Sequence, residues 1–141
     1  MANTYQLQVI TPERTLLNDQ VEMTIAPGAE GDLGVLAGHM ALMTTLNPGE
    51  VTVTMGDGRT TSHIVISGGF MEVSPQGTVI LADAAERSDE IDVTRAEVDL
   101  SEARKMLADV TPGTPEAKAA EDRVTHAEVR IRIGRSNGSG S

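Results

Sequence analysis

Hydrophobic and polar residues alternate along much of the first ninety positions, with the period of a strand that buries one face. The alternation is clear in residues 5–9, 21–25 and 51–55. Turn signals such as Asn47-Pro48-Gly49 separate segments of this kind roughly every eight to twelve residues. We therefore predict that residues 1–88 form a flattened β-sandwich or barrel of about ten short strands.

The period changes after Ile91, where apolar residues recur at spacings of three and four, as on one stripe of a helix. Two such stripes flank the breaker Thr111-Pro112-Gly113-Thr114, whose last threonine can cap the second helix. We predict an antiparallel two-helix hairpin over residues 89–134. The remaining residues, 135–141, are rich in Gly and Ser and are expected to form a flexible tail.

Alanine dominates the apolar stripe of the predicted second helix, at Ala117, Ala120 and Ala127. Such small side chains let two helix axes approach closely. Each alanine, however, buries much less than the roughly 1.5–3 kcal/mol worth of a leucine or isoleucine side chain. The hairpin is therefore expected to be weakly held and able to leave the β domain.

Composition excludes several classes of protein. The chain has no cysteine, so disulfides, thiol catalysis and Cys-based zinc sites are excluded. Its first residues have neither the basic flank nor the apolar segment of a signal peptide. No apolar run approaches the roughly 18 residues of a membrane-spanning helix, so no segment is expected to span a membrane, and a peripheral role through a partner stays open.

Charge is distributed unevenly along the chain. The formal net charge is −10, and residues 1–91 account for −9 of it, with 12 acidic and 3 basic side chains. Such an acidic body would repel phosphates, which argues against nucleic acid as a partner. Residues 111–141, with 4 acidic and 5 basic side chains, carry +1 and form a separate surface that can meet an acidic partner.

Candidate chemistry is sparse. The histidines show no His-Glu-x-x-His or comparable metal-ligand spacing, so no metal site is predicted. The glycine-rich residues 28–39 lack the Lys-Ser/Thr end of a phosphate-binding loop and carry Glu30 and Asp32 where phosphate would lie. Two compatible interpretations remain: a glycine-rich connection between strands, or a protein-contact loop with an exposed acid at its tip.

An acidic cluster follows the predicted sandwich and consists of Glu86, Asp89, Glu90 and Asp92. One interpretation is a solvated linker whose last acid caps the next helix, since acids suit a helix N-terminus. The others are a divalent-cation site and a nucleotide site completed by Arg95.

Arg123, His126 and Arg130 are spaced by three and four and share one face of the second predicted helix. They form either a solvated face balanced by nearby acids or a positive stripe that docks on an acidic partner. Composition alone slightly favours the solvated face.

Five segments, in this order and at this spacing, resemble the epsilon subunit of bacterial F-type ATP synthase. They are Gly31–His39, Leu46–Val51, Ser67–Val73, Ile80–Glu86 and Ile91-Asp92. The resemblance covers about residues 4–110, and the second helix is similar to the family in type and length but not in sequence detail. It implies a β-sandwich followed by a helical hairpin, in agreement with the two periodicities.

The resemblance further implies a non-catalytic place in the rotor, or central stalk, where the subunit couples gamma to the c-ring in proton-driven ATP synthesis. In this family an acid in the turn before Leu-Gly contacts the polar loops of the c-ring, and the matching residue is Asp32, flanked by Glu30 and Gly31. His39 is expected near gamma. The subunit would be a peripheral protein at the cytoplasmic face of the bacterial inner membrane.

The family's hairpin can extend into the catalytic head of alpha and beta subunits and inhibit ATP hydrolysis. The resemblance therefore implies that Arg123, His126 and Arg130 meet acidic segments of the beta subunits when the hairpin is extended.

No cofactor is required by this role, but some members of the family bind ATP. The alternative function is therefore a nucleotide-sensing regulatory module that binds ATP weakly through the first helix. The matching residues are Glu86, Ile91, Asp92, Arg95 and Ala96. Glu102 lies at or near the place of an arginine that assists ATP binding in those members, and its charge would repel phosphate.

Overall fold

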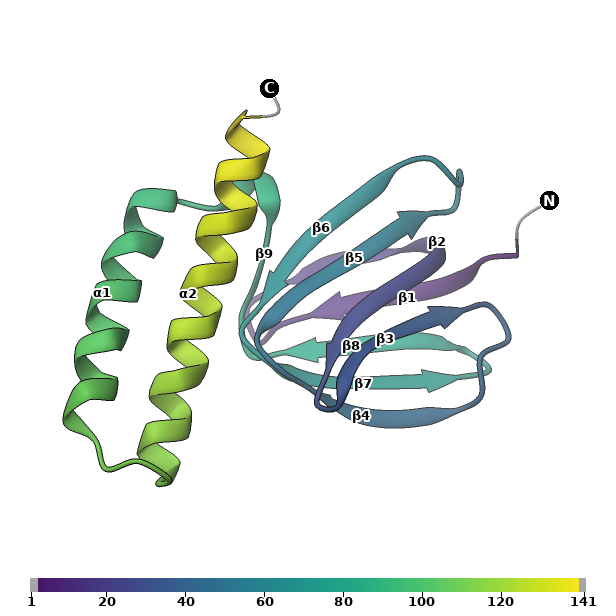
Figure 1. Ribbon diagram of the computed structural model, residues 1–141. Coiled ribbons are helices and arrows are strands. Elements are labelled where there is room, and N and C mark those ends of the chain that lie inside the picture. The colour runs from purple at the N-terminus through teal and green to yellow at the C-terminus, as the bar shows by residue number, and fades with distance from the viewer. Residues whose placement is uncertain (1–2, 140–141) are drawn as a thin grey trace.

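The computed structural model describes residues 3–139 and shows a β domain followed by a helical hairpin (Figure 1). Nine strands form the β domain within these residues. They are β1 (Tyr5–Ile10), β2 (Thr15–Gly28), β3 (Gly31–Leu36), β4 (Leu42–Leu46), β5 (Gly49–Met55), β6 (Thr61–Ile66), β7 (Gly69–Ser74), β8 (Gly77–Ala82) and β9 (Ala85–Arg87). The predicted fold class is confirmed, with nine described strands in place of about ten.

The strands form two layers. Hydrogen-bonded neighbours run β1-β8-β7-β4 in one layer and β3-β2-β5-β6-β9 in the other. The 14-residue β2 belongs to both layers, because its first half pairs with β1 and its second half with β3 and β5. Its register against β5 shifts between Val21 and Met23, so Glu22 is an extra residue at which β2 bends from one layer into the other.

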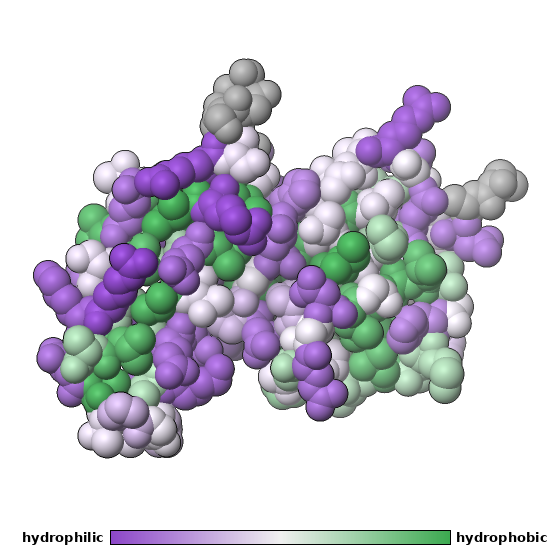
Figure 2. Space-filling model, viewed as in Figure 1, coloured by the Kyte–Doolittle hydropathy of each residue, from purple (hydrophilic) through white to green (hydrophobic). Residues whose placement is uncertain are grey.

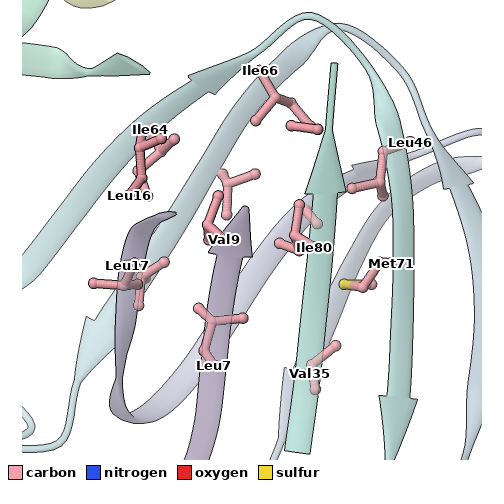
Figure 3. Close-up of a cluster of buried hydrophobic side chains, with 14 of the residues drawn as sticks. Leu7, Val9, Leu16, Leu17, Val35, Leu46, Ile64, Ile66, Met71 and Ile80 are labelled. Carbon is pink, nitrogen blue, oxygen red and sulfur yellow. The ribbon is translucent and has the colours of Figure 1, made fainter. Parts of the chain in front are cut away.

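The core lies between the layers and is built from the inward-pointing residues of the alternating segments (Figure 3). Leu7 and Val9 of β1, Met71 of β7 and Ile80 of β8 are all fully buried. With one tyrosine and one phenylalanine in the whole chain, this interior is filled by aliphatic side chains and methionine. The layers therefore lie close together, as in a flattened sandwich.

Tyr5 joins three strands from inside the sandwich. Its hydroxyl donates to the Val35 carbonyl oxygen at 3.0 Å and lies 2.6 Å from the Thr24 Oγ1. Burial raises the pKa of the tyrosine, against an opposing effect of the Thr24 hydrogen bond. This side chain connects β1 to β2 and supports β3 from behind.

The glycine-rich residues 28–39 contain a strand, so the interpretation as a plain connection is wrong for much of their length. β3 pairs antiparallel with β2 across a two-residue turn, Ala29-Glu30. Val35 is buried and Leu33 is packed partly buried against the core. The alternation of these apolar residues, which is the signature of a half-buried strand, outweighs the glycines between them.

The helical part begins after the short 3-10 helix and has two helices. They are η1 (Ser88–Glu90), α1 (Val93–Asp109) and α2 (Pro115–Ser139). Side-chain caps begin both α-helices, as predicted. The Asp92 carboxylate accepts a hydrogen bond from the Arg95 N–H at 3.0 Å, and the Thr114 hydroxyl accepts one from the Ala117 N–H at 3.1 Å.

α2 continues beyond the predicted end of the hairpin at residue 134 and includes residues 135–139, so the prediction of a flexible tail is wrong there. Gly134 is buried so close to Val93 that a Cβ would lie 2.6 Å from the Val93 Cγ2. Arg135 Nη2 is 3.2 Å from Glu97 Oε2 on α1. These contacts hold a further turn of α2. The rest of the predicted tail, residues 140–141, lies outside the described residues.

α2 lies between α1 and the sandwich (Figure 1). The two helices pack through buried alanines at positions 96, 103, 117, 120 and 127. α2 in turn packs on β5, β6 and η1. Among the described residues of the hairpin, Ile133 is the one buried side chain larger than alanine. The hairpin therefore rests on the sandwich with little apolar burial.

Candidate interaction surfaces

Glu30, Gly31 and Asp32, here called the acid turn, are exposed where β2 turns into β3. The turn is held from behind, because the Ala29 N–H donates to the Thr45 carbonyl oxygen at 3.1 Å. Within the described part of the chain, neither carboxylate has an intramolecular hydrogen bond or ion pair. The acid turn thus presents two charges to solvent on a fixed support, which suits a polar or basic partner surface.

His39 lies in the connection between β3 and β4, at the other end of β3 from the acid turn. β3 is long enough to separate the two by roughly 17 Å. The His39 Nδ1 is 2.8 Å from the Met40 carbonyl oxygen. Leu36 and Met40 beside it are 58% and 82% exposed. The two contacts implied by the family resemblance therefore fall at opposite ends of one strand.

An apolar patch on the outer face of β4, β7 and β8 was missed by sequence reasoning. Met43, Phe70 and Leu81, here called the outer apolar patch, are 70%, 56% and 53% exposed. Phe70 lies opposite Leu81, and Met43 lies on a neighbouring pair of the same face. The sequence of β7 contains a sign of this patch. Phe70 lies on the same face of the strand as the charged Glu72, and Met71 between them points into the core.

An open groove of about 650 Å³ joins the acid turn to the outer apolar patch. It is lined by residues 28–33 of the β2–β3 hairpin, residues 42–45 of β4, and Phe70. Acidic and apolar groups thus lie on one continuous surface of the sandwich.

The hairpin has a different surface character. Figure 2 shows one face of the molecule, on which hydrophobic residues gather over part of the sandwich and along the seam between the helices. Hydrophilic residues project from the flanks of the hairpin in the same view. The most exposed large hydrophobic residues are on the sandwich, while Val98 and Met106 of α1 are 43% and 41% exposed.

Three of the residues matched to ATP binding have structural roles. Asp92 caps α1, and Ala96 is fully buried in that helix. Ile91 packs against Gly134, where a Cβ would lie 3.0 Å from the Ile91 Cγ2. Glu102, which would repel phosphate, lines a small cavity of about 220 Å³ between the helices. Nucleotide binding stays a prediction.

The other two residues matched to ATP binding, Glu86 and Arg95, belong to one chain of ion pairs. The Arg130 guanidinium pairs with Glu86 of β9 and, at 2.9 Å, with Asp99 of α1. Asp99 is in turn 3.1 Å from the Arg95 guanidinium. The Arg130 side chain is only 12% exposed. We call Arg130, Glu86 and Asp99 the ionic latch, because they connect α2 both to the sandwich and to α1.

The predicted positive stripe of α2 faces inward over most of its length. Arg130 belongs to the ionic latch. His126 is half-buried, and its pKa is lowered by burial and by the charge of Arg130, with Asp99 opposing. Arg123 is exposed, with its Nη1 3.4 Å from the Met106 Sδ. In this conformation the stripe holds the hairpin together, and its contact with beta subunits stays a prediction for an extended hairpin.

Arg14, which sequence reasoning also missed, anchors the acidic linker. Its guanidinium donates two hydrogen bonds to Glu90, at 2.9 and 2.8 Å, and the Arg87 N–H donates a third at 2.8 Å. The bonds from Arg14, followed by the one from Arg87, lower the pKa of Glu90 to about 2. Within residues 3–139, no group of three or more His, Cys, Asp or Glu side chains is arranged to hold a metal ion.

Comparison with known proteins connects these features to one family. The model of the ATP synthase delta/epsilon chain β-sandwich domain matches residues 4–88. The ATP synthase epsilon chains of Brucella canis and of Brucella suis biovar 1 are each 43% identical over 119 residues, which cover 84% of this chain and 87% of theirs.

Two solved structures share the fold. A chain in the cryo-EM structure of the Euglena gracilis mitochondrial ATP synthase, OSCP/F1/c-ring, is 28% identical with a TM-score of 0.74, over 89% of this chain and 78% of its own. A chain in the Tetrahymena thermophila mitochondrial ATP synthase central stalk/c-ring structure has a TM-score of 0.62, over 94% of this chain and 98% of its own. At 16% identity, the second match shows the fold alone.

A β-sandwich that matches this family model, followed by a helical hairpin, places the chain in the class of ATP synthase stalk subunits, which are not the catalytic ones. This chain belongs to the ATP synthase epsilon chain family. The predictions of that family, and of a rotor subunit that is not the catalytic one, are confirmed. Within the described residues, no helix is both long enough and apolar enough to cross a membrane.

Proposed function

We propose that this chain couples gamma to the c-ring in the central stalk during proton-driven ATP synthesis. The observation that carries the proposal is the continuous surface on which one groove joins the acid turn to the outer apolar patch. A coupling subunit needs two different contacts on one rigid body, and the sandwich offers a charged one and an apolar one.

The acid turn is proposed to contact the polar loops of the c-ring. Glu30 and Asp32 are exposed, and the hydrogen bond from the Ala29 N–H holds their turn in place. A contact of this kind is electrostatic, so it gives register and association rate more than affinity, and salt weakens it.

The outer apolar patch and the connection around His39 are proposed to contact gamma. Leu36 and Met40, beside His39, add to the exposed apolar surface. Burying such side chains against a partner gains roughly 25 cal/mol per Å² of apolar surface, before the cost of association. Gamma would therefore supply the stronger of the two contacts.

A charge placed in the outer apolar patch tests the gamma contact. We expect Phe70→Asp to weaken binding to a complex of alpha, beta and gamma subunits by roughly 10- to 100-fold, because a carboxylate would be desolvated in the interface. The control is Val98→Asp, since Val98 is 43% exposed on α1, away from the patch. Binding is measured by titration, and equal affinities of the two variants would exclude the patch from the gamma contact.

The hairpin is proposed to inhibit ATP hydrolysis when it leaves the sandwich and extends toward the alpha and beta subunits. Its small apolar contact with the sandwich supports this mobility. Deletion of residues 92–141 is expected to raise hydrolysis while coupled synthesis in membrane vesicles persists. If neither rate changes, the hairpin has no inhibitory role in this synthase.

The chain is proposed to act at the cytoplasmic face of the bacterial inner membrane, held there by the c-ring and gamma. The proposal requires no cofactor. The residues matched to ATP binding are engaged in a cap, in packing and in ion pairs, so the nucleotide-sensing alternative has less support in this conformation.

A further inference from the structure

β3 leaves one edge of the sandwich unpaired. Its strand partner is β2, whereas β4, the next strand in the chain, pairs along its length with β7. Within the described residues, no backbone hydrogen bond joins β3 to β4. Figure 1 shows the two strands on the same side of the sandwich, at the edges of their layers. An open edge of this kind can pair with a strand from another chain.

The pairing of β3 with β2 determines which of its backbone groups are open. Gly28 and Gly31 flank the two-residue turn as a hydrogen-bonded pair, and such pairs alternate with non-hydrogen-bonded pairs along an antiparallel ladder. The amides of Leu33 and Val35 therefore point toward β2. The open amides are those of Asp32, Gly34 and Leu36.

The side chains along this edge define what could pair with it. On the inner side, Leu33 and Leu42 are partly buried hydrophobic residues that border the core, and both line the groove. On the outer side, Asp32 is exposed at the end next to the acid turn, and Leu36 is 58% exposed at the other end. An added strand would thus place its inner side chains against apolar groups and its outer side chains between Asp32 and Leu36.

We propose that β3 takes up an extended segment of gamma as an added strand, and that the side chains of this segment that face Leu33 and Leu42 are apolar. The proposal rests on the proposed function, since gamma is the partner. Charge supports this occupant, because residues 1–91 carry a formal charge of −9, which favours a segment that also carries basic residues. A second copy of this chain would bring Asp32 of each copy into one interface, which disfavours it as the occupant.

Hydrogen exchange tests the added strand directly. The exchange of single amides is compared between the free chain and the chain bound to a complex of alpha, beta and gamma subunits without the c-ring. The open amides of β3 are expected to exchange at least about tenfold more slowly in the complex. Those of Leu33 and Val35 should be slow in both states. Unchanged exchange of the open amides, or their protection in a dimer of the free chain, would overturn the proposal.

Two variants of Gly34 test the same pairing through affinity. Gly34→Pro removes one open N–H without removing a bond to β2, and proline is tolerated on an edge with this orientation. Gly34→Ala is the matched control, because it keeps the N–H and its Cβ would meet nothing within 4 Å. Thermal unfolding of the free variants checks that both are folded.

Gly34→Pro is expected to bind the alpha–beta–gamma complex roughly 3- to 10-fold more weakly than Gly34→Ala, as for the loss of one hydrogen bond. Equal affinities of the two variants would overturn strand addition, while wild-type binding would still support the proposed function. Failure of the wild-type chain to bind the complex would instead contradict the proposed function itself.

Discussion

Single polar side chains fix the geometry at several points where separate segments of this chain meet. The Tyr5 hydroxyl reaches the Val35 carbonyl oxygen of β3, thirty residues away. Arg14, in the connection between β1 and β2, donates hydrogen bonds to Glu90 in the linker, 76 residues away. These bonds are few, so the effect of each should be measurable by replacing one side chain.

Glu90 gives a prediction with a defined pH dependence. Its pKa of about 2 lies below its ordinary value near 4.5, so the folded state favours the charged form. The stabilisation is therefore present above about pH 4.5 and is lost as the pH falls toward 2. Glu90→Gln should lower the Tm by roughly 2–4 °C at pH 7 and by almost nothing near pH 2. The effect at pH 7 is small because solvent screens this partly exposed ion pair.

The control for this prediction is Asp83→Asn, which neutralises an exposed carboxylate with no ion pair among the described residues. Its Tm should differ little from that of the wild type over the same pH range. A Tm difference for Glu90→Gln that stays constant from pH 7 to pH 2 would show that the charge of Glu90 is not what stabilises the linker.

The two elements of the molecule are held by different forces. The sandwich has a continuous aliphatic core, whereas the hairpin contributes alanines, Ile133, the ionic latch and a partly exposed ion pair of Arg132 with Glu50 at 3.7 Å to its contacts. Partly buried ion pairs are costly to break on one side, because the remaining charges lose their partner. Docking of the hairpin therefore depends on Arg130 more than on any apolar side chain.

Arg130→Gln is expected to release the hairpin while the sandwich stays folded. The change leaves Glu86 and Asp99 without their shared cation, at a cost of roughly 1–3 kcal/mol. Because the chain has no cysteine, spin labels can be placed through Asp83→Cys on the sandwich and Glu116→Cys on α2. The distance distribution between the labels should broaden and move to longer values.

Arg104→Gln is the matched control, since Arg104 pairs with Glu128 at 3.6 Å within the hairpin and both side chains are more than half exposed. Its label distances should stay those of the wild type. A broadened distribution in both variants, or in neither, would remove the special role of the ionic latch.

The elements could be predicted where a local pattern decides, and not where distant contacts decide. The period of two and the spacing of three and four predict the strands and both helices. β3 was missed because its glycines resemble a loop, and the last turn of α2 was missed because Gly134 is held by Val93, far away in sequence. The acid turn was predicted from the family resemblance. The outer apolar patch was not predicted, because alternation shows that a strand has two faces but not which face points into the core.

At the scale of the whole molecule, a rigid sandwich carries the proposed contacts with the c-ring and gamma, and a hairpin on an ionic latch is the movable part. The acid turn and the connection around His39 lie at opposite ends of β3. One strand therefore spans the two proposed interfaces, and force can pass between them through the hydrogen-bonded sheet without bending a loop.

Crosslinking of the acid turn in the assembled synthase tests this coupling role most directly. Asp32→Cys is introduced into the cysteine-free chain, and a second cysteine into the polar loop of the c subunit. The control is Asp57→Cys, which is exposed in the turn between β5 and β6. Oxidation should join Asp32→Cys to the c subunit while ATP-driven rotation persists, because both partners belong to the rotor, whereas Asp57→Cys should give no crosslink. No crosslink at Asp32→Cys, or equal crosslinking at both sites, would contradict the account.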